Sequence, residues 1–128
     1  IKLEPIEELI VEEKIILNPI YFDFNMFNIT NQAAFELDKL VAIMKKYPEM
    51  VISAESHTDS RGPSSYNKLL SDKRAKSTAQ YVVSKGISEE RISGIGKGEE
   101  YPEIDCESGC SKDDHAKNRR SEFIIISR

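Results

Sequence analysis

The fold of this chain is indicated first by two neighbouring segments, HTDSRG at residues 57–62 and NKLLSDKRA at residues 67–75. The first follows an apolar stretch that predicts a strand, so it forms a turn that carries Asp59. The second begins a helix with one face that is apolar or small apart from Arg74. The pattern therefore predicts a carboxylate and a guanidinium near one another at the edge of a core.

Outward from these segments, the chain predicts alternating strands and helices. The β-branched and aromatic run at residues 15–24 predicts a first strand, and residues 50–56 predict a second. Thr30 is placed to cap a helix that ends before Pro48. A second helix is expected at residues 65–85, followed by a glycine in the left-handed conformation.

The last third of the chain adds two strands and a long polar loop at residues 97–114. Residues 91–96 and 123–126 are predicted strands, the latter buried on nearly both faces because its apolar residues are consecutive. The order β-α-β-α-β-β predicts an α/β (α+β) sandwich, in which two main helices cover a mixed four-stranded sheet. This places one domain at residues 15–128, with the acidic residues 1–14 as a linker or domain edge.

Length and composition limit the class of protein. A chain of 128 residues suffices for one domain with one sizeable core. The formal net charge of −4 argues against a general nucleic-acid binder, which needs a basic face. No apolar run approaches the ~20 residues that span a bilayer, and no signal peptide is visible. Because the first residue is Ile1 rather than Met, we expect a piece of a longer protein.

Arg74 is placed where it needs a partner. Steps of four, three and four residues put Asn67, Ser71, Arg74 and Thr78 in one column at the border of the buried helix face. A guanidinium near a core requires a carboxylate or another strong acceptor, and Asp59 is the nearest candidate in chain order. Two interpretations remain open. The two residues form an internal brace, or they bind a ligand with an ammonium and a carboxylate on one carbon.

Cys106 and Cys110 lie four residues apart in the polar loop. We expect them to form a disulfide, which would place the domain outside the cytosol. Free thiols and a metal site remain alternatives. For structural zinc two thiolates are too few, and His115 supplies only a third ligand.

The two opening segments resemble the signature of OmpA-like C-terminal domains, as in outer-membrane protein A and the peptidoglycan-associated lipoprotein. Further matches follow in the same order along residues 15–128. They are Ile20–Asn25, then Gly96, Gly98, Glu99 and Pro102, then Asn118-Arg119-Arg120. The chain has Ser56 where the family commonly has glycine, and its cysteine loop is not part of the general pattern.

The resemblance implies non-covalent binding of peptidoglycan through the diaminopimelate of the stem peptide, with no cofactor and no catalysis. It implies a domain tethered at the periplasmic face of the outer membrane by a part that precedes Ile1, in the cell envelope. By motif position, Asp59 takes the ligand ammonium and Arg74 its carboxylate as a bidentate fork. The other implied contacts are hydrogen bonds from Asn67 and Thr58, an apolar contact from Leu70, and a rim of Asn25 and Arg119.

Two other functions are kept beside this one. A metal-dependent cell-wall hydrolase would use His57 and Asp59 as ligands, with His115 or Asp114 as a third, although catalytic zinc usually needs three fixed ligands. A structural interaction domain would use Asp59 and Arg74 only to brace each other.

Overall fold

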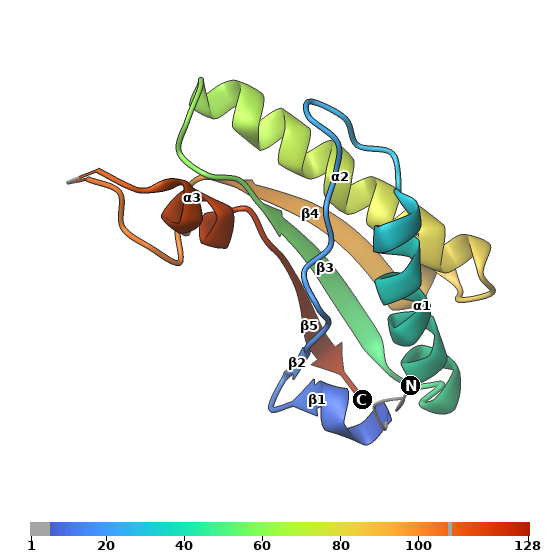
Figure 1. Ribbon diagram of the computed structural model, residues 1–128. Coiled ribbons are helices and arrows are strands. Elements are labelled where there is room, and N and C mark those ends of the chain that lie inside the picture. Colours follow the sequence, from blue (N-terminus) through green and yellow to red (C-terminus); the bar gives the residue numbers. More distant parts are fainter. Residues whose placement is uncertain (1–5, 108) are drawn as a thin grey trace.

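The computed structural model describes residues 6–107 and 109–128, so residues 1–5 of the predicted linker lie outside it. Its elements follow in chain order (Figure 1): the 3-10 helix η1 (Ile6–Leu9), β1 (Ile10–Val11), β2 (Lys14–Ile15), α1 (Asn31–Lys46), β3 (Val51–His57), α2 (Ser64–Ser84), the 3-10 helix η2 (Glu89–Arg91), β4 (Ile92–Gly98), α3 (Lys112–Asn118) and β5 (Ser121–Ser127). None of the helices in these described ranges is long and apolar enough to span a membrane.

The strands form one mixed sheet in the order β1-β2-β5-β3-β4. β3 and β4 pair in parallel, whereas β5 pairs antiparallel with both β3 and β2. A parallel pair needs a crossover connection, and α2 provides it. The mixed α/β class predicted from the sequence is confirmed, with five strands in place of four.

The core lies on one face of this sheet. Buried residues alternate with less buried ones along β3 and β5, which is typical of strands with a single covered face. The prediction that residues 123–126 are buried on nearly both faces is therefore wrong, since Ile126 is 61% exposed. α1 covers this face, with Leu37, Leu40 and Met44 fully buried. The predicted start of α1 is confirmed, because the Thr30 hydroxyl accepts a hydrogen bond from the Ala33 N–H at 3.1 Å.

The strand predicted at residues 15–24 is wrong beyond Ile15, where β2 ends. Side chains of α1 satisfy the backbone of this segment, so it does not need a strand partner. The Asn18 N–H donates to Glu36 at 2.9 Å, and the Tyr21 N–H donates to Gln32 at 2.9 Å. The segment therefore runs as a loop along α1, and part of it is free to line a cleft.

Besides the 3-10 helices η1 and η2, one strand and one α-helix were not predicted. The short β1 pairs with β2 at the edge of the sheet, within the residues expected to be a linker or domain edge. α3 interrupts the predicted polar loop at residues 97–114 and continues beyond it. Its start carries a capping box, in which Ser111 and Asp114 each bond the other's backbone N–H.

α2 packs unusually close to β4 because glycines face the helix. A Cβ added to Gly94 would lie 2.2 Å from the Ala75 carbonyl oxygen, and one added to Gly96 would lie 2.1 Å from the Asp72 nitrogen. The glycine-rich stretch of β4 thus serves helix–strand contact. The Ser71 hydroxyl, fully buried in the contact, accepts a hydrogen bond from the Gly98 N–H at 2.9 Å.

β3 ends in a buried histidine. Both ring nitrogens of His57 are buried without a hydrogen-bond partner among the described residues, and the ring lies edge-on to Tyr101. Burial, followed by the Arg120 charge, lowers the pKa of His57 from 6.5 to about 4. The imidazole is therefore neutral near pH 7, so its 3.7 Å approach to Glu122 is not an ion pair at that pH.

We predict that Gly96→Ala lowers the free energy of unfolding by about 2 kcal/mol or more, because the added methyl group overlaps the backbone of α2. Urea denaturation measures the loss. Ser93→Ala is the matched control, since Ser93 is an exposed residue of the same strand and should keep wild-type stability. Equal stability of Gly96→Ala and wild type would contradict the close contact.

We also predict that the domain loses stability as the pH falls from about 6.5 to about 4. The folded-state pKa of His57 lies below the unfolded value, so over this window the unfolded chain binds a proton that the folded domain does not. His57→Gln should flatten the slope of unfolding free energy against pH in this window. An imidazole NMR titration of His57 with a midpoint near 6.5 would refute the assignment.

Candidate ligand-binding cleft

A cleft of about 780 Å³ opens at one end of the sheet, where three parts of the chain meet. These parts are the loop before α1, the turn between β3 and α2 with the start of α2, and the end of α3 with the start of β5. All seven residues predicted for the site line this cleft: Asn25, Thr58, Asp59, Asn67, Leu70, Arg74 and Arg119. Their roles in binding stay predictions.

Hydrogen bonds from the segments on either side hold the end of β3, where the chain reaches the cleft. The His57 N–H donates to the Arg120 carbonyl at 2.8 Å, and the Thr58 N–H donates to the Gly98 carbonyl at 2.9 Å. The pairing of β3 with β4 shifts its register between Ser56 and His57. These contacts hold Thr58 and Asp59 at the edge of the sheet, both buried.

Asp59 is the centre of a small charged network. Its Oδ1 accepts from the Arg61 backbone N–H at 3.0 Å and from Arg61 Nε at 3.2 Å. Its Oδ2 accepts from Arg61 Nη2 at 2.8 Å and from Arg119 Nη1 at 2.7 Å. Burial alone would disfavour the charge, but the bonds from Arg61 and Arg119 outweigh it and hold the pKa of Asp59 well below 3.8.

Arg74 is not the partner of Asp59, so the alternative in which Asp59 and Arg74 brace each other is wrong. Arg74 Nε donates to the Met26 carbonyl at 2.8 Å, and its Nη2 donates to the Asp23 carbonyl at 3.2 Å. Its guanidinium also lies 4.9 Å from the centre of the Phe22 ring. Burial lowers the pKa of Arg74, but a guanidinium stays charged. Arg74 therefore ties α2 to the loop before α1.

Asn67 holds the turn that carries Asp59. Its side-chain amide donates to the carbonyls of Asp59 at 3.4 Å and Arg61 at 2.9 Å, and to the Glu99 carboxylate at 3.0 Å. In this arrangement only its Oδ1 is left to meet a ligand. The Thr58 hydroxyl is buried without a hydrogen-bond partner among the described residues, so it can still donate or accept a bond.

The rim of the cleft comes from the loop and from α3. Asn25 has a left-handed backbone, with φ of 57°, and its Oδ1 accepts from the Tyr66 hydroxyl at 2.7 Å. Arg119 follows α3 directly and reaches Asp59 from there. Its direction depends on the buried Asn118, which exchanges two hydrogen bonds of 2.8 and 2.9 Å with the backbone of Ile104.

Sequence reasoning missed Arg61 as a site residue. The signal was its place two residues after Asp59, where an aspartate side chain in a turn commonly accepts the backbone N–H. Pairing of the Arg61 side chain itself follows from the conformation of the turn, which has Gly62 at φ of 82°.

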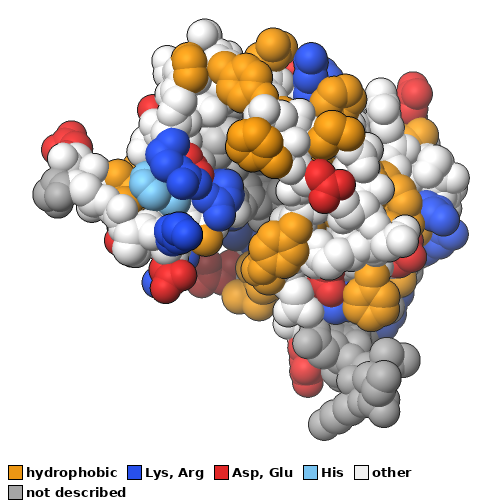
Figure 2. Space-filling model, turned by 45° about the horizontal axis from the view of Figure 1, so that its top comes forward, with side chains coloured by type: hydrophobic (Ala, Val, Ile, Leu, Met, Phe, Trp, Pro, Cys, Tyr) orange, Lys and Arg blue, Asp and Glu red, His pale blue; other side chains and the backbone are white. Residues whose placement is uncertain are grey.

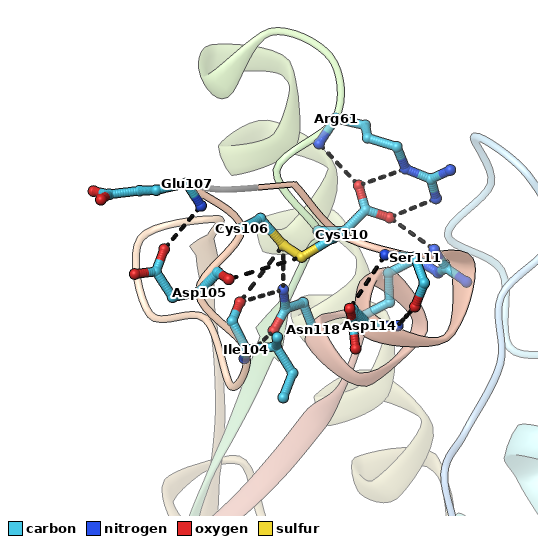
Figure 3. Close-up of a disulfide and its surroundings, with 11 residues drawn as sticks. Arg61, Ile104, Asp105, Cys106, Glu107, Cys110, Ser111, Asp114 and Asn118 are labelled. Carbon is cyan, nitrogen blue, oxygen red and sulfur yellow. Dashed lines mark hydrogen bonds and ion pairs between the residues drawn. A yellow bond between two sulfur atoms is a disulfide. The ribbon is translucent and has the colours of Figure 1, made fainter.

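Cys106 and Cys110 form a disulfide, which confirms the prediction. It lies beside Asn118 in Figure 3, where Asn118 Nδ2 approaches Cys106 Sγ at 3.5 Å. Within the described ranges, the one group of three potential metal ligands is Cys106, Cys110 and His115. Both sulfur atoms of this group are bonded to each other in the disulfide. No third potential metal ligand lies with His57 and Asp59 in the part of the chain that the structure describes.

Positive charge dominates the lining of the cleft. Among the residues that the structure describes, four arginines line it together with a single carboxylate, Asp59: Arg61, Arg74, Arg119 and Arg120. Figure 2 brings this end of the molecule forward and shows Lys and Arg side chains gathered beside a group of hydrophobic ones. The cleft thus differs from the chain as a whole, which has a net charge of −4. It is suited to a ligand that carries carboxylates and an apolar portion.

The sequence of this chain is similar to those of two known bacterial proteins. The chain is 36% identical over 107 residues to the peptidoglycan-associated lipoprotein of Buchnera aphidicola, covering 84% of this chain and 60% of the relative. It is 33% identical over 106 residues to outer membrane porin F of Pseudomonas fluorescens, covering 83% of this chain and 32% of the porin. The chain thus spans about a third to about three fifths of these two relatives.

A solved structure has the same fold. The crystal structure of the peptidoglycan-associated lipoprotein from Burkholderia pseudomallei superimposes with a TM-score of 0.73 at 27% identity, covering 83% of this chain and 87% of that one. The family model described as the OmpA family matches residues 21–119, which include the turn at Asp59, both main helices and Arg119. The chain therefore belongs to the OmpA family.

Proposed function

We propose that this domain binds peptidoglycan non-covalently in the cleft and thereby anchors a larger protein of the cell envelope to the wall. The observation that carries the proposal is the convergence of Asp59, Arg74 and Thr58 on one cleft at the end of the sheet. The names of the relatives support it, since a peptidoglycan-associated lipoprotein is 36% identical to this chain.

We further propose that the recognised group is the free end of diaminopimelate, where one carbon bears an ammonium and a carboxylate. Asp59 stays ionised at neutral pH and attracts the ammonium. Arg74 attracts the carboxylate, and a guanidinium suits a carboxylate because its N–H groups match both oxygens. Lysine lacks this carboxylate at the end of its side chain, so Arg74 is the residue that distinguishes the two.

Arg74 keeps donors for this task although it also holds the loop. Its described hydrogen bonds use Nε and one N–H of Nη2. A guanidinium has five N–H donors, so Nη1 and the second N–H of Nη2 remain on its outer edge. These two nitrogens can bind the two oxygens of one carboxylate. Loop ordering and ligand binding are therefore compatible in one side chain.

The remaining contacts are proposed from the same lining. The Thr58 hydroxyl and Asn67 Oδ1 provide hydrogen bonds, Leu70 provides an apolar contact, and Asn25 with Arg119 closes the rim. This work is positional and breaks no bond. A periplasmic location on the outer membrane side fits both the relatives' names and the disulfide, which forms in oxidising compartments.

We predict that Asp59→Ala and Arg74→Ala each weaken binding to purified diaminopimelate-type sacculi at least about tenfold, the size expected for loss of a charge-assisted hydrogen bond. Co-sedimentation of folded protein, checked by circular dichroism, measures the binding. Glu100→Ala and Lys76→Ala are matched controls, because both side chains are exposed and neither lines the cleft. These controls should pellet like wild type.

Two further measurements distinguish the alternatives. Free meso-diaminopimelate should displace the domain from sacculi, whereas Nα-acetyllysine amide should not at the same concentration, because the carbon that bears its ammonium carries no carboxylate. No soluble wall fragments should appear, with or without a chelator; chelator-sensitive release would favour the hydrolase instead. Folded Asp59→Ala and Arg74→Ala proteins that pellet like wild type would show that the site is assigned wrongly.

A further inference from the structure

We infer that Arg61 occupies the ammonium position of the cleft and must swing off Asp59 before a ligand binds there. Arg61 is thereby the residue that sets which ligands enter. The inference rests on the proposed function, since it concerns how Asp59 becomes available to an ammonium. It starts from the hydrogen bonds that the two carboxylate oxygens of Asp59 accept.

The carboxylate of Asp59 has no acceptor position to spare. An ionised carboxylate offers about four lone-pair sites. The Arg61 backbone N–H and Arg61 Nε fill those of Oδ1, at 3.0 and 3.2 Å. Arg61 Nη2 and Arg119 Nη1 fill those of Oδ2, at 2.8 and 2.7 Å. The side chain is also only 9% exposed, so an added ammonium must replace a bond already made.

The side chain of Arg61 is the partner whose departure suits an ammonium. When this side chain moves away, one acceptor position becomes free on each oxygen of Asp59. An ammonium has three N–H donors and can bridge these two oxygens. Departure of Arg119 would free a position on Oδ2 alone. The Arg61 side chain is 57% exposed, and all described hydrogen bonds of its guanidinium are to Asp59, so the guanidinium enters water when released.

The turn itself can stay in place during this exchange. The Arg61 backbone N–H remains on Oδ1, and Asn67 still holds the Asp59 and Arg61 carbonyls at 3.4 and 2.9 Å. Arg119 remains on Oδ2. Only one side chain moves, and the carboxylate keeps its position for the incoming group.

This exchange gives the cleft its selectivity. Replacing a guanidinium by an ammonium on the same carboxylate gains little, because one charge-assisted pair substitutes for another. A simple amine therefore does not displace Arg61 to a useful extent. A ligand that also places a carboxylate on Arg74 gains a second interaction and does displace it. Arg61 thus acts as an internal competitor that rejects amines without an adjacent carboxylate.

The test compares wild type with Arg61→Ala, using meso-diaminopimelate and ethylamine as probes in NMR titrations of the folded domain. Removal of the competitor should tighten binding of meso-diaminopimelate at least about threefold, because the binding-competent fraction rises. It should also make ethylamine binding detectable. Lys97→Ala is the control for loss of a nearby positive charge; Lys97 makes no contact with Asp59 and should leave affinity unchanged.

The Arg61 Nε–H signal of wild type provides a second measurement. It should move toward the position of a solvated arginine as meso-diaminopimelate saturates the site. If wild type binds and this signal does not move, or if Arg61→Ala binds equally or more weakly, the inference is overturned while the proposed function stands. If neither protein binds meso-diaminopimelate or sacculi, the proposed function fails and the inference with it.

Discussion

The close contact between α2 and β4 is the constraint on which the rest of the site depends. Gly94 and Gly96 allow the helix backbone to approach the strand, and Ser71 bonds the backbone of Gly98 within the contact. This contact fixes both the distance of α2 from the sheet and the rotation of the helix about its axis. Asn67, one turn earlier, then reaches the turn at Asp59. Arg74, nearly one turn later, lies on the border of the buried face and reaches the loop before α1. A small change in the helix–strand distance would move all three side chains together.

The cleft is assembled from segments far apart in the chain, and arginines join them. Arg74 connects α2 to the loop at residues 23–26 through two carbonyls. Arg119 connects the end of α3 to Asp59, across 60 residues of sequence. Arg120, directly before β5, connects the start of that strand to the loop at Tyr101 through a hydrogen bond of 2.9 Å to the Tyr101 carbonyl. Each guanidinium holds backbone or carboxylate oxygens with several donors, so it orders a loop that has little apolar area of its own. The site therefore owes its shape to polar contacts on a core that the helices and sheet provide.

Much of this arrangement could be predicted from local patterns. The helix α1 between Thr30 and Pro48, the turn at Asp59 and the column of residues on α2 each follow from neighbouring residues. The seven site residues that the family resemblance implied all line one cleft. The errors have a common cause, since each concerned a distant partner. Residues 15–24 have a strand-like composition, yet Glu36 and Gln32 satisfy their backbone. Asp59 and Arg74 follow one another on neighbouring elements, yet they do not pair. Asp59 pairs with Arg61, two residues away, and Arg74 donates to backbone carbonyls of the loop before α1. α3 was the exception, because its capping box was visible in the sequence.

The charges of the cleft bear on how firmly one domain would hold its ligand. Arg120 is paired with Glu122 at 2.9 Å, and Arg61 and Arg119 share Asp59, whereas no carboxylate among the described residues pairs with Arg74. Under the proposed function, Arg74 is thus the charge that a ligand carboxylate newly satisfies, while an ammonium on Asp59 only replaces Arg61. The net gain for each domain is therefore modest. If the domain binds the wall as proposed, the wall polymer presents the same group many times, and several such domains act together through effective concentration. Modest single contacts that exchange readily can then hold a protein at the wall while each domain remains free to shift along it.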